Sequence, residues 1–178
     1  MSEHTGGADA NWERRLADLW RTLDDAEADG DAFVTRIDVL SAELPPGDAI
    51  GLFERGAARD SIGRPQEAVA LYRAALGAGL TGLRRRRATI QMASSLRNLG
   101  QPAEAQRLLA AELLQPSDEL DGAVRAFLAL ALVDLGRERE AVATSLTALS
   151  RYLPRYNRSL ARYALALAPP PADAKTRD

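Results

Sequence analysis

Four consecutive arginines, Arg84 to Arg87, are the residues of this chain best suited to bind an anionic group; they lie in LTGLRRRRATIQMASSLRNLG. A guanidinium group can hold a carboxylate or a phosphate through two parallel hydrogen bonds. Successive residues of a helix point about 100° apart, so four in a row cannot all face one ligand. Arg84 and Arg87 can share a face, whereas Arg85 and Arg86 must face a neighbouring helix or water.

Groups that could perform catalysis are scarce. The sequence of 178 residues has no cysteine, and its one histidine, His4, lies in a polar, glycine-containing leader. A thiolate nucleophile, a disulfide and a cysteine metal site are therefore excluded. Carboxylates such as Glu104, Glu138 and Glu140 are spread over positions that we expect to be solvated rather than paired in a pocket. We expect no enzyme and no cofactor.

One acidic run imitates the first half of a calcium-binding loop, with carboxylates at Asp25, Glu27, Asp29 and Asp31 around Gly30. The twelfth position of such a loop should hold a bidentate glutamate, but here it is Arg36, whose charge opposes a bound cation. We interpret the run as an acidic turn between helices, in which Asp31 caps the following helix.

Composition limits the remaining classes. The net charge of −2, the pI of about 5.6 and the 46% hydrophobic content fit a globular domain and argue against a strong nucleic-acid binder. The start MSEHTGGADA lacks the features of a signal peptide, and no stretch approaches the roughly 18 apolar residues of a membrane span. We expect no membrane partner, a cytoplasmic location and, from the excess of Arg over Lys, a GC-rich genome.

Three glycines repeat along the chain at nearly constant spacing. Gly63, Gly100 and Gly136 are 37 and 36 residues apart, and each follows and precedes an apolar stretch of helical period. Small residues lie five positions after each glycine (Ala68, Ala105, Ala141) and seven before it (Gly56, Ala93, Ala129). The pattern predicts helices that end at these glycines, turn tightly and pack closely against their neighbours.

The pattern resembles the tetratricopeptide repeat, a helix-turn-helix unit of about 34 residues. The first clear unit matches best, with Gly56, Gly63, Ala68, Tyr72 and Ala75 at the family's small and aromatic positions. The resemblance is closest to the small bacterial group-5 tetratricopeptide proteins. It implies an all-α, right-handed solenoid of antiparallel helical hairpins with a C-terminal capping helix. It further implies a protein-interaction module that forms dimers.

The expected boundaries follow from the repeats. We expect a disordered leader over residues 1–10, a single helical-repeat domain over 11–168 and a disordered tail over 169–178. The hairpins are expected at 11–44 (turning at Gly30), 48–77, 84–114 and 119–152, and the capping helix at 155–168.

Within the expected repeat, the first helix of each unit lines a concave groove. Counting back from Gly100 puts a polar strip on that side, and the predicted partner site comprises Arg87, Ile90, Ser94, Arg97 and Asn98, together with Phe53. An Asn amide can pair with an extended peptide backbone. The resemblance adds that family members often hold peptides with groove Asn and basic residues. Two alternatives remain for the arginine run: ion pairs with acids of adjacent helices, or contact with RNA or DNA. Contact with nucleic acid is disfavoured because the run has no interleaved aromatic residues.

A second surface is predicted in GAVRAFLALALVDLG, which is apolar on nearly all sides and should direct Ala126, Leu130 and Val133 into the groove. Either the capping helix around Leu160 and Tyr163 covers these residues, or a second chain does. We therefore predict a non-enzymatic protein- or peptide-binding scaffold. The alternatives are a structural homodimer that fills its own groove, and a regulatory nucleic-acid-binding protein.

Overall fold

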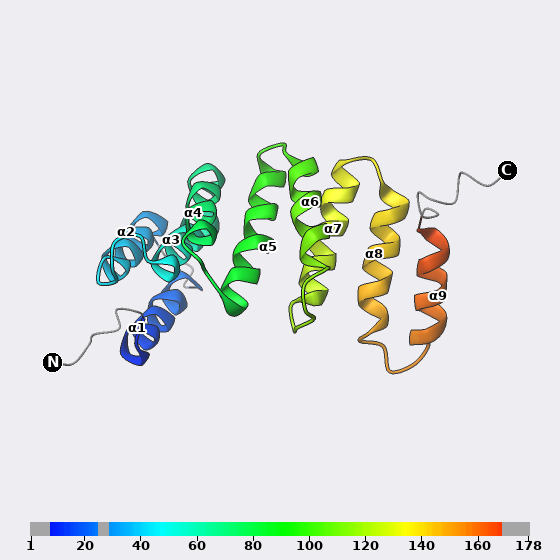
Figure 1. Ribbon diagram of the computed structural model, residues 1–178, viewed down its shortest axis with the longest axis horizontal. Coiled ribbons are helices and arrows are strands. Elements are labelled where there is room, and N and C mark those ends of the chain that lie inside the picture. Colours follow the sequence, from blue (N-terminus) through cyan, green and yellow to red (C-terminus); the bar gives the residue numbers. More distant parts are fainter. Residues whose placement is uncertain (1–7, 25–28, 169–178) are drawn as a thin grey trace. The chain divides into compact units, whose positions relative to one another are not determined.

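The computed structural model describes residues 8–24 and 29–168, and over these ranges every regular element is helical (Figure 1). The helices are α1 (Ala10–Arg21), the short 3-10 helix η1 (Thr22–Asp24), α2 (Gly30–Ser41), α3 (Ala49–Ser61), α4 (Pro65–Gly77), α5 (Gly82–Asn98), α6 (Pro102–Glu112), α7 (Asp121–Asp134), α8 (Glu138–Ser150) and α9 (Asn157–Leu167). The predicted all-α fold class is confirmed. The right hand of the solenoid remains a prediction.

The helices belong to two compact units, Met1–Leu99 and Gly100–Asp178. In the first unit α2 packs on α3, α3 on α4 and α4 on α5, while α3 also contacts α5 directly. In the second unit α6 packs on α7, α7 on α8 and α8 on α9. Each helix therefore packs against its sequence neighbours within its unit, as a helical repeat requires.

The N-terminal helices are held by one apolar cluster in the first unit. Its buried members are Trp12, Leu16, Phe33, Val34, Ile37, Leu40, Leu44 and Ala58. The indole N–H of Trp12 donates to the carbonyl of Leu40 at 2.9 Å, so the one polar atom of this ring is satisfied inside the core. The cluster joins α1 to α2 and α2 to α3.

The turn at Gly63 has the geometry expected after a helix. Gly63 has a φ of 77°, its N–H donates to the carbonyl of Asp60, and the N–H of Arg64 donates to that of Arg59. Two such bonds close the last turn of α3 and need a left-handed residue, which glycine adopts without strain. Gly100 and Gly136 have φ values of 73° and 70°, so the prediction that these glycines end helices is confirmed.

Gly30 behaves differently from the other repeat glycines. It is the first residue of α2 rather than the turn itself, and Asp29, not Asp31, caps the helix by accepting from the N–H groups of Asp31 and Ala32. The predicted turn at Gly30 and the predicted cap are therefore wrong, because Asp29 is the residue with the extended backbone that a cap requires. Asp25 and Glu27 of the imitated calcium loop lie outside the described residues.

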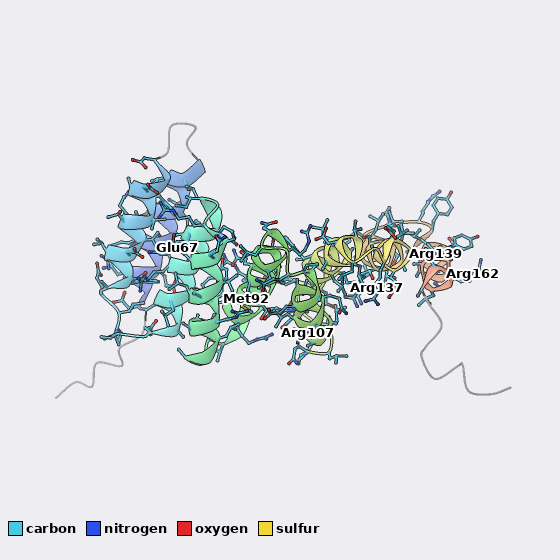
Figure 2. The ribbon with its side chains drawn as sticks, turned by 90° about the horizontal axis from the view of Figure 1, so that it is seen from above. Glu67, Met92, Arg107, Arg137, Arg139 and Arg162 are labelled. Atoms are coloured by element: carbon cyan, nitrogen blue, oxygen red, sulfur yellow. The ribbon has the colours of Figure 1, made fainter. Side chains whose placement is uncertain are left out.

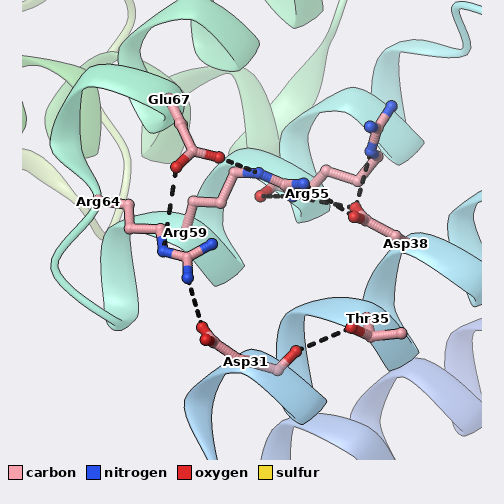
Figure 3. A network of polar contacts seen from close by, with 7 residues as sticks. All are labelled: Asp31, Thr35, Asp38, Arg55, Arg59, Arg64 and Glu67. Atoms are coloured by element: carbon pink, nitrogen blue, oxygen red, sulfur yellow. Dashed lines mark hydrogen bonds and ion pairs between the residues drawn. The ribbon is translucent and has the colours of Figure 1, made fainter.

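A polar network on the first unit ties α2 to α3 and α4 (Figure 3). Both oxygens of Asp38 accept from Arg59, at 2.9 and 2.8 Å, and Arg55 Nε donates to the same carboxylate at 2.9 Å. Burial acts against the charge of Asp38, but the bonds from Arg59 and Arg55 outweigh it and lower its pKa. Arg59 also donates to Glu67 on α4 at 3.2 Å. These contacts stabilise the hairpin from which the candidate site is built.

Candidate partner-binding site

The candidate site lies on α3 and α5 of the first unit. Of the predicted residues on α5, Arg87 and Asn98 are exposed, Ser94 and Arg97 are half-buried, and Ile90 is buried. Phe53 on α3 is completely buried. At helical spacing, Arg87, Ser94 and Asn98 point within about 40° of one another, so they form one strip along α5. Phe53 supports Arg87 from beneath and Ile90 lies beside the strip, and both are too buried to contact a partner directly.

Arg87 is positioned by an aromatic ring rather than by an acid. Its guanidinium carbon lies 5.2 Å from the centroid of the Phe53 ring, within the range of a cation–π contact. Phe53 in turn contacts Tyr72 of α4, with ring centroids 6.1 Å apart. Tyr72 is buried against the backbone of α3 at Gly56, where an added Cβ would lie 3.0 Å from its ring. The close packing of α3 on α4 therefore fixes the ring beneath the Arg87 cation.

Asp60 connects the same three helices beneath the strip. Its two oxygens accept from Ser95 of α5 at 2.6 Å and from the Tyr72 hydroxyl at 3.3 Å. Burial raises the pKa of the Asp60 carboxyl, although the bonds from Ser95 and Tyr72 act in the opposite direction. Burial and the Asp60 charge also raise the pKa of Tyr72, so its hydroxyl stays a donor.

Arg84 has a different role from Arg87, three residues later. Its Nε donates to Glu54 of α3 at 2.9 Å, and its two terminal nitrogens donate to Glu13 of α1 at 2.9 and 2.6 Å. Glu54 is 2% exposed and also accepts from the Trp20 indole at 3.0 Å. Burial acts against the Arg84 charge, but the bond to Glu13 and the charge of Glu54 outweigh it and raise the pKa. For Arg84 the alternative of ion pairing with adjacent helices is therefore correct.

Glu54, Asp60 and Trp20 are site residues that the sequence analysis missed. Glu54 and Asp60 lie on α3, six residues apart, within a helix whose small residues Gly56, Ala57 and Ala58 are all buried. An acid flanked by residues of a predicted close contact is a signal of a buried polar partner, since an unpaired charge there would be costly. For Arg86 the sequence carries no such signal of burial: it is 2% exposed although the residues on either side of it are also arginines.

The predicted apolar surface of the second unit lies on α7. Leu130 and Val133 are 45% and 49% exposed, and Ala126 is exposed as well. Two segments were expected to cover this apolar surface, the capping helix or a second chain. The capping helix α9 does not cover it, since α9 packs against α8 and has no contact with α7 among the described elements. This leaves a second chain as the cover to be tested.

Metal and membrane chemistry find no support in the described ranges. Over residues 8–24 and 29–168, no three His, Asp or Glu side chains gather as a metal site would require. No described helix is both long enough and apolar enough to cross a bilayer.

The helical pairs, the glycine turns and the absence of strands in the described chain define a helical-repeat protein. Comparison with protein families matches residues 49–167 to the group-5 tetratricopeptide repeat family (Tetratrico peptide repeat), and this chain belongs to it. The match begins with α3 and ends with α9, so α1 and α2 lie outside it. Comparisons with curated proteins and with solved structures find no match. Proteins of this family are generally non-enzymatic scaffolds that bind other proteins or peptides.

Proposed function

We propose that this protein is a non-enzymatic scaffold that binds an acidic or carboxylate-ending peptide segment on the α5 strip, Arg87, Ser94 and Asn98. The observation that carries the proposal is the exposed guanidinium of Arg87, held over the buried ring of Phe53. A cation fixed by packing loses less side-chain entropy on binding than a freely moving one. Its fork of N–H donors suits a carboxylate.

The strip offers two kinds of polar contact. Arg87 supplies charge, and Asn98, about three turns further along α5, supplies one amide donor and one acceptor for an extended backbone. Ser94 lies between them. Arg97 and Ile90 flank this strip on α5, and we propose that Arg97 adds a second basic contact at the end near Asn98.

The experiment measures binding of fluorescent peptides from a library in which acidic content and a free or amidated C-terminus are varied independently. We expect peptides with acidic or free C-termini to be enriched, and Arg87→Ala to abolish this preference while the melting temperature stays nearly unchanged. Arg87→Lys should retain part of the affinity, because it keeps the charge and loses the fork.

The matched control is Arg36→Ala, which removes an exposed arginine from α2 of the same unit. If Arg36→Ala and Arg87→Ala reduce binding equally, the effect is one of net charge and the proposed site is wrong. The same conclusion follows if Arg85→Ala, which removes a cation about 200° away around α5, reproduces the loss.

A second role is favoured by the exposed apolar residues of α7. We propose that Ala126, Leu130 and Val133 form the contact between two copies of the chain, since apolar side chains gathered on one helix face tend to be covered by a partner. This contact lies in the second unit, whereas the proposed peptide site lies in the first.

A further inference from the structure

The C-terminal part of the second unit repeats one dipeptide. Arginine precedes tyrosine at Arg151-Tyr152, Arg155-Tyr156 and Arg162-Tyr163. The chain has four tyrosines, and these three are 69%, 77% and 59% exposed, whereas Tyr72 is completely buried. The Tyr152 hydroxyl lies against α7 at Gly122, so packing of the helices explains part of its position. The exposed rings of Tyr156 and Tyr163 each follow an arginine in the sequence, and no packing contact of these two rings with the described helices accounts for their exposure.

Charge is segregated within this unit. Residues 141–168 contain four arginines, Arg151, Arg155, Arg158 and Arg162, and no acid. Residues 100–140 contain eight acids and four arginines. The net charge of the two segments together is zero, but the second segment alone is basic, so its positive charge lies on the end of α8, the following turn and α9. Asp121 of α7 pairs with Arg151 at 3.0 Å, which leaves three arginines to define the surface charge.

Basic and aromatic side chains lie together at the N-terminal half of α9. Tyr156, the residue before this helix, has a φ of 65°, which is uncommon for a non-glycine residue. Tyr156, Arg158 and Arg162 line an open cavity of about 470 Å³, together with Asn157 and Ser159. The guanidinium carbon of Arg162 lies 5.4 Å from the ring centroid of Tyr163. Arg162 can be followed on α9 in Figure 2.

We propose that this surface, Tyr152, Arg155, Tyr156, Arg158, Arg162 and Tyr163, binds single-stranded nucleic acid. Exposed tyrosine rings stack on unpaired bases, and nearby arginines neutralise the phosphates between them. The arginine run on α5 lacks interleaved aromatic residues and was disfavoured for that reason, but the C-terminal surface has both components. Because a duplex keeps its bases stacked within the helix, the tyrosines select single strands.

The experiment titrates the full-length protein with fluorescein-labelled single-stranded RNA and DNA of mixed sequence, with the matching duplex and with poly-glutamate. We expect single strands to bind more tightly than the duplex and poly-glutamate to compete poorly. Replacing Tyr156 and Tyr163 together by Ala should weaken single-strand binding by about tenfold or more, while the two Phe replacements should retain it.

The charge component has its own readout. Replacing Arg158 and Arg162 by Gln should reduce the slope of log affinity against log salt by about 0.7 per arginine. Arg107→Gln, which removes an exposed arginine from α6 of the same unit, should change neither slope nor affinity. Circular dichroism melts of all variants establish that the fold is retained.

Three results would overturn the proposal. One is equal affinity for single strands and poly-glutamate, which would assign the surface to an acidic protein segment. Another is unchanged binding after loss of both tyrosines, and the third is no binding of any oligonucleotide at low salt. Arg87→Ala should leave oligonucleotide binding intact, so this test and that of the α5 strip can fail independently.

Discussion

Glu54 shows how one residue decides whether a neighbouring arginine serves structure or binding. Its carboxylate is inside the first unit and accepts from both Trp20 and Arg84. Arg84 is thereby directed toward α1 and α3 and is not offered to a ligand. Arg87 meets the Phe53 ring instead of a carboxylate and keeps its exposed donors. Arg84 therefore has a structural role because it meets the carboxylate of Glu54, whereas Arg87 remains available for binding because it meets the apolar ring of Phe53.

The first prediction tests this division. Glu54→Ala should lower the free energy of unfolding by about 2–3 kcal/mol, because it leaves Arg84 and the Trp20 indole without a buried acceptor. Glu13→Ala removes the other partner of Arg84 but is 37% exposed, so it should cost about 1 kcal/mol or less. Urea unfolding of both variants measures the difference. Equal losses would show that Glu54 does not hold Arg84 as the geometry indicates.

The second prediction concerns the pH dependence of stability. Burial raises the pKa of Asp60 in the folded protein, so the folded state favours the protonated carboxyl more than the unfolded state does. This contribution is present below the ordinary aspartate pKa and is lost as the pH rises through the folded pKa. Asp60→Asn removes this pH-dependent contribution. As the pH falls from about 7 to about 4, the free energy of unfolding of the parent should therefore rise relative to that of the variant.

Comparing the two proteins at each pH cancels titrations that they share, including that of Asp38, whose pKa is lowered. A stability difference that stays constant between the two pH values would contradict the assigned environment of Asp60. The measurement is chemical unfolding at both values.

Sequence spacing could place side chains on one face of α5 but could not tell which of them were already occupied. The helical period places the side chains of Arg84 and Arg87 on one face of α5 but does not indicate that it is Arg84 that pairs with acids. Their partners come from α1 and α3, which are distant in sequence. The small residues that follow Glu54 indicate that this acid is buried, but they do not indicate which arginine it pairs with. Ile90 was assigned to the groove by the same counting, yet it lies about 60° around α5 from Arg87 and is buried.

At the scale of the helices, the glycines divide into those that need their conformation and those that do not. Gly63 has a φ of 77°, which an L-residue with a side chain adopts only at a cost. Gly77 ends α4 with an ordinary helical backbone, and an added Cβ there meets no described atom within 4 Å.

The third prediction is that alanine at these two positions has opposite effects. Gly63→Ala should destabilise by about 1 kcal/mol through backbone strain. Gly77→Ala should stabilise by up to about 1 kcal/mol, because alanine restricts the unfolded chain and favours the helix. Thermal melts of both variants decide the matter, and a shift of the same sign in both would refute the assignment of Gly63 to the left-handed turn.

The helices and their turns were largely predictable because each is specified locally. Pro65 and Pro102 begin α4 and α6, and a glycine in left-handed conformation follows α3, α5 and α7. The start of α2 was mispredicted since both Asp29 and Asp31 could cap a helix beginning near Gly30. Only the backbone conformation distinguishes the two aspartates.

At the scale of the whole molecule, the net charge of −2 is a poor guide to binding. Acids and arginines are unevenly distributed, and residues 141–168 have no acid at all. The value for the whole chain argues against nucleic acid, whereas residues 141–168 alone carry four arginines and three exposed tyrosines. Local charge and exposure, which need the fold, decide what each surface can bind.

The last prediction concerns the oligomeric state. If the exposed residues of α7 join two chains, sedimentation equilibrium should give a dimer for the parent protein. Leu130→Glu with Val133→Glu should give a monomer, because two charges would be buried without partners in the contact. Leu114→Glu is the control, since Leu114 is 86% exposed beyond the end of α6 and its replacement should leave the dimer intact. A parent that stays monomeric at high concentration would contradict the proposed contact between two chains. Dissociation by Leu114→Glu would instead place the contact at the turn between α6 and α7.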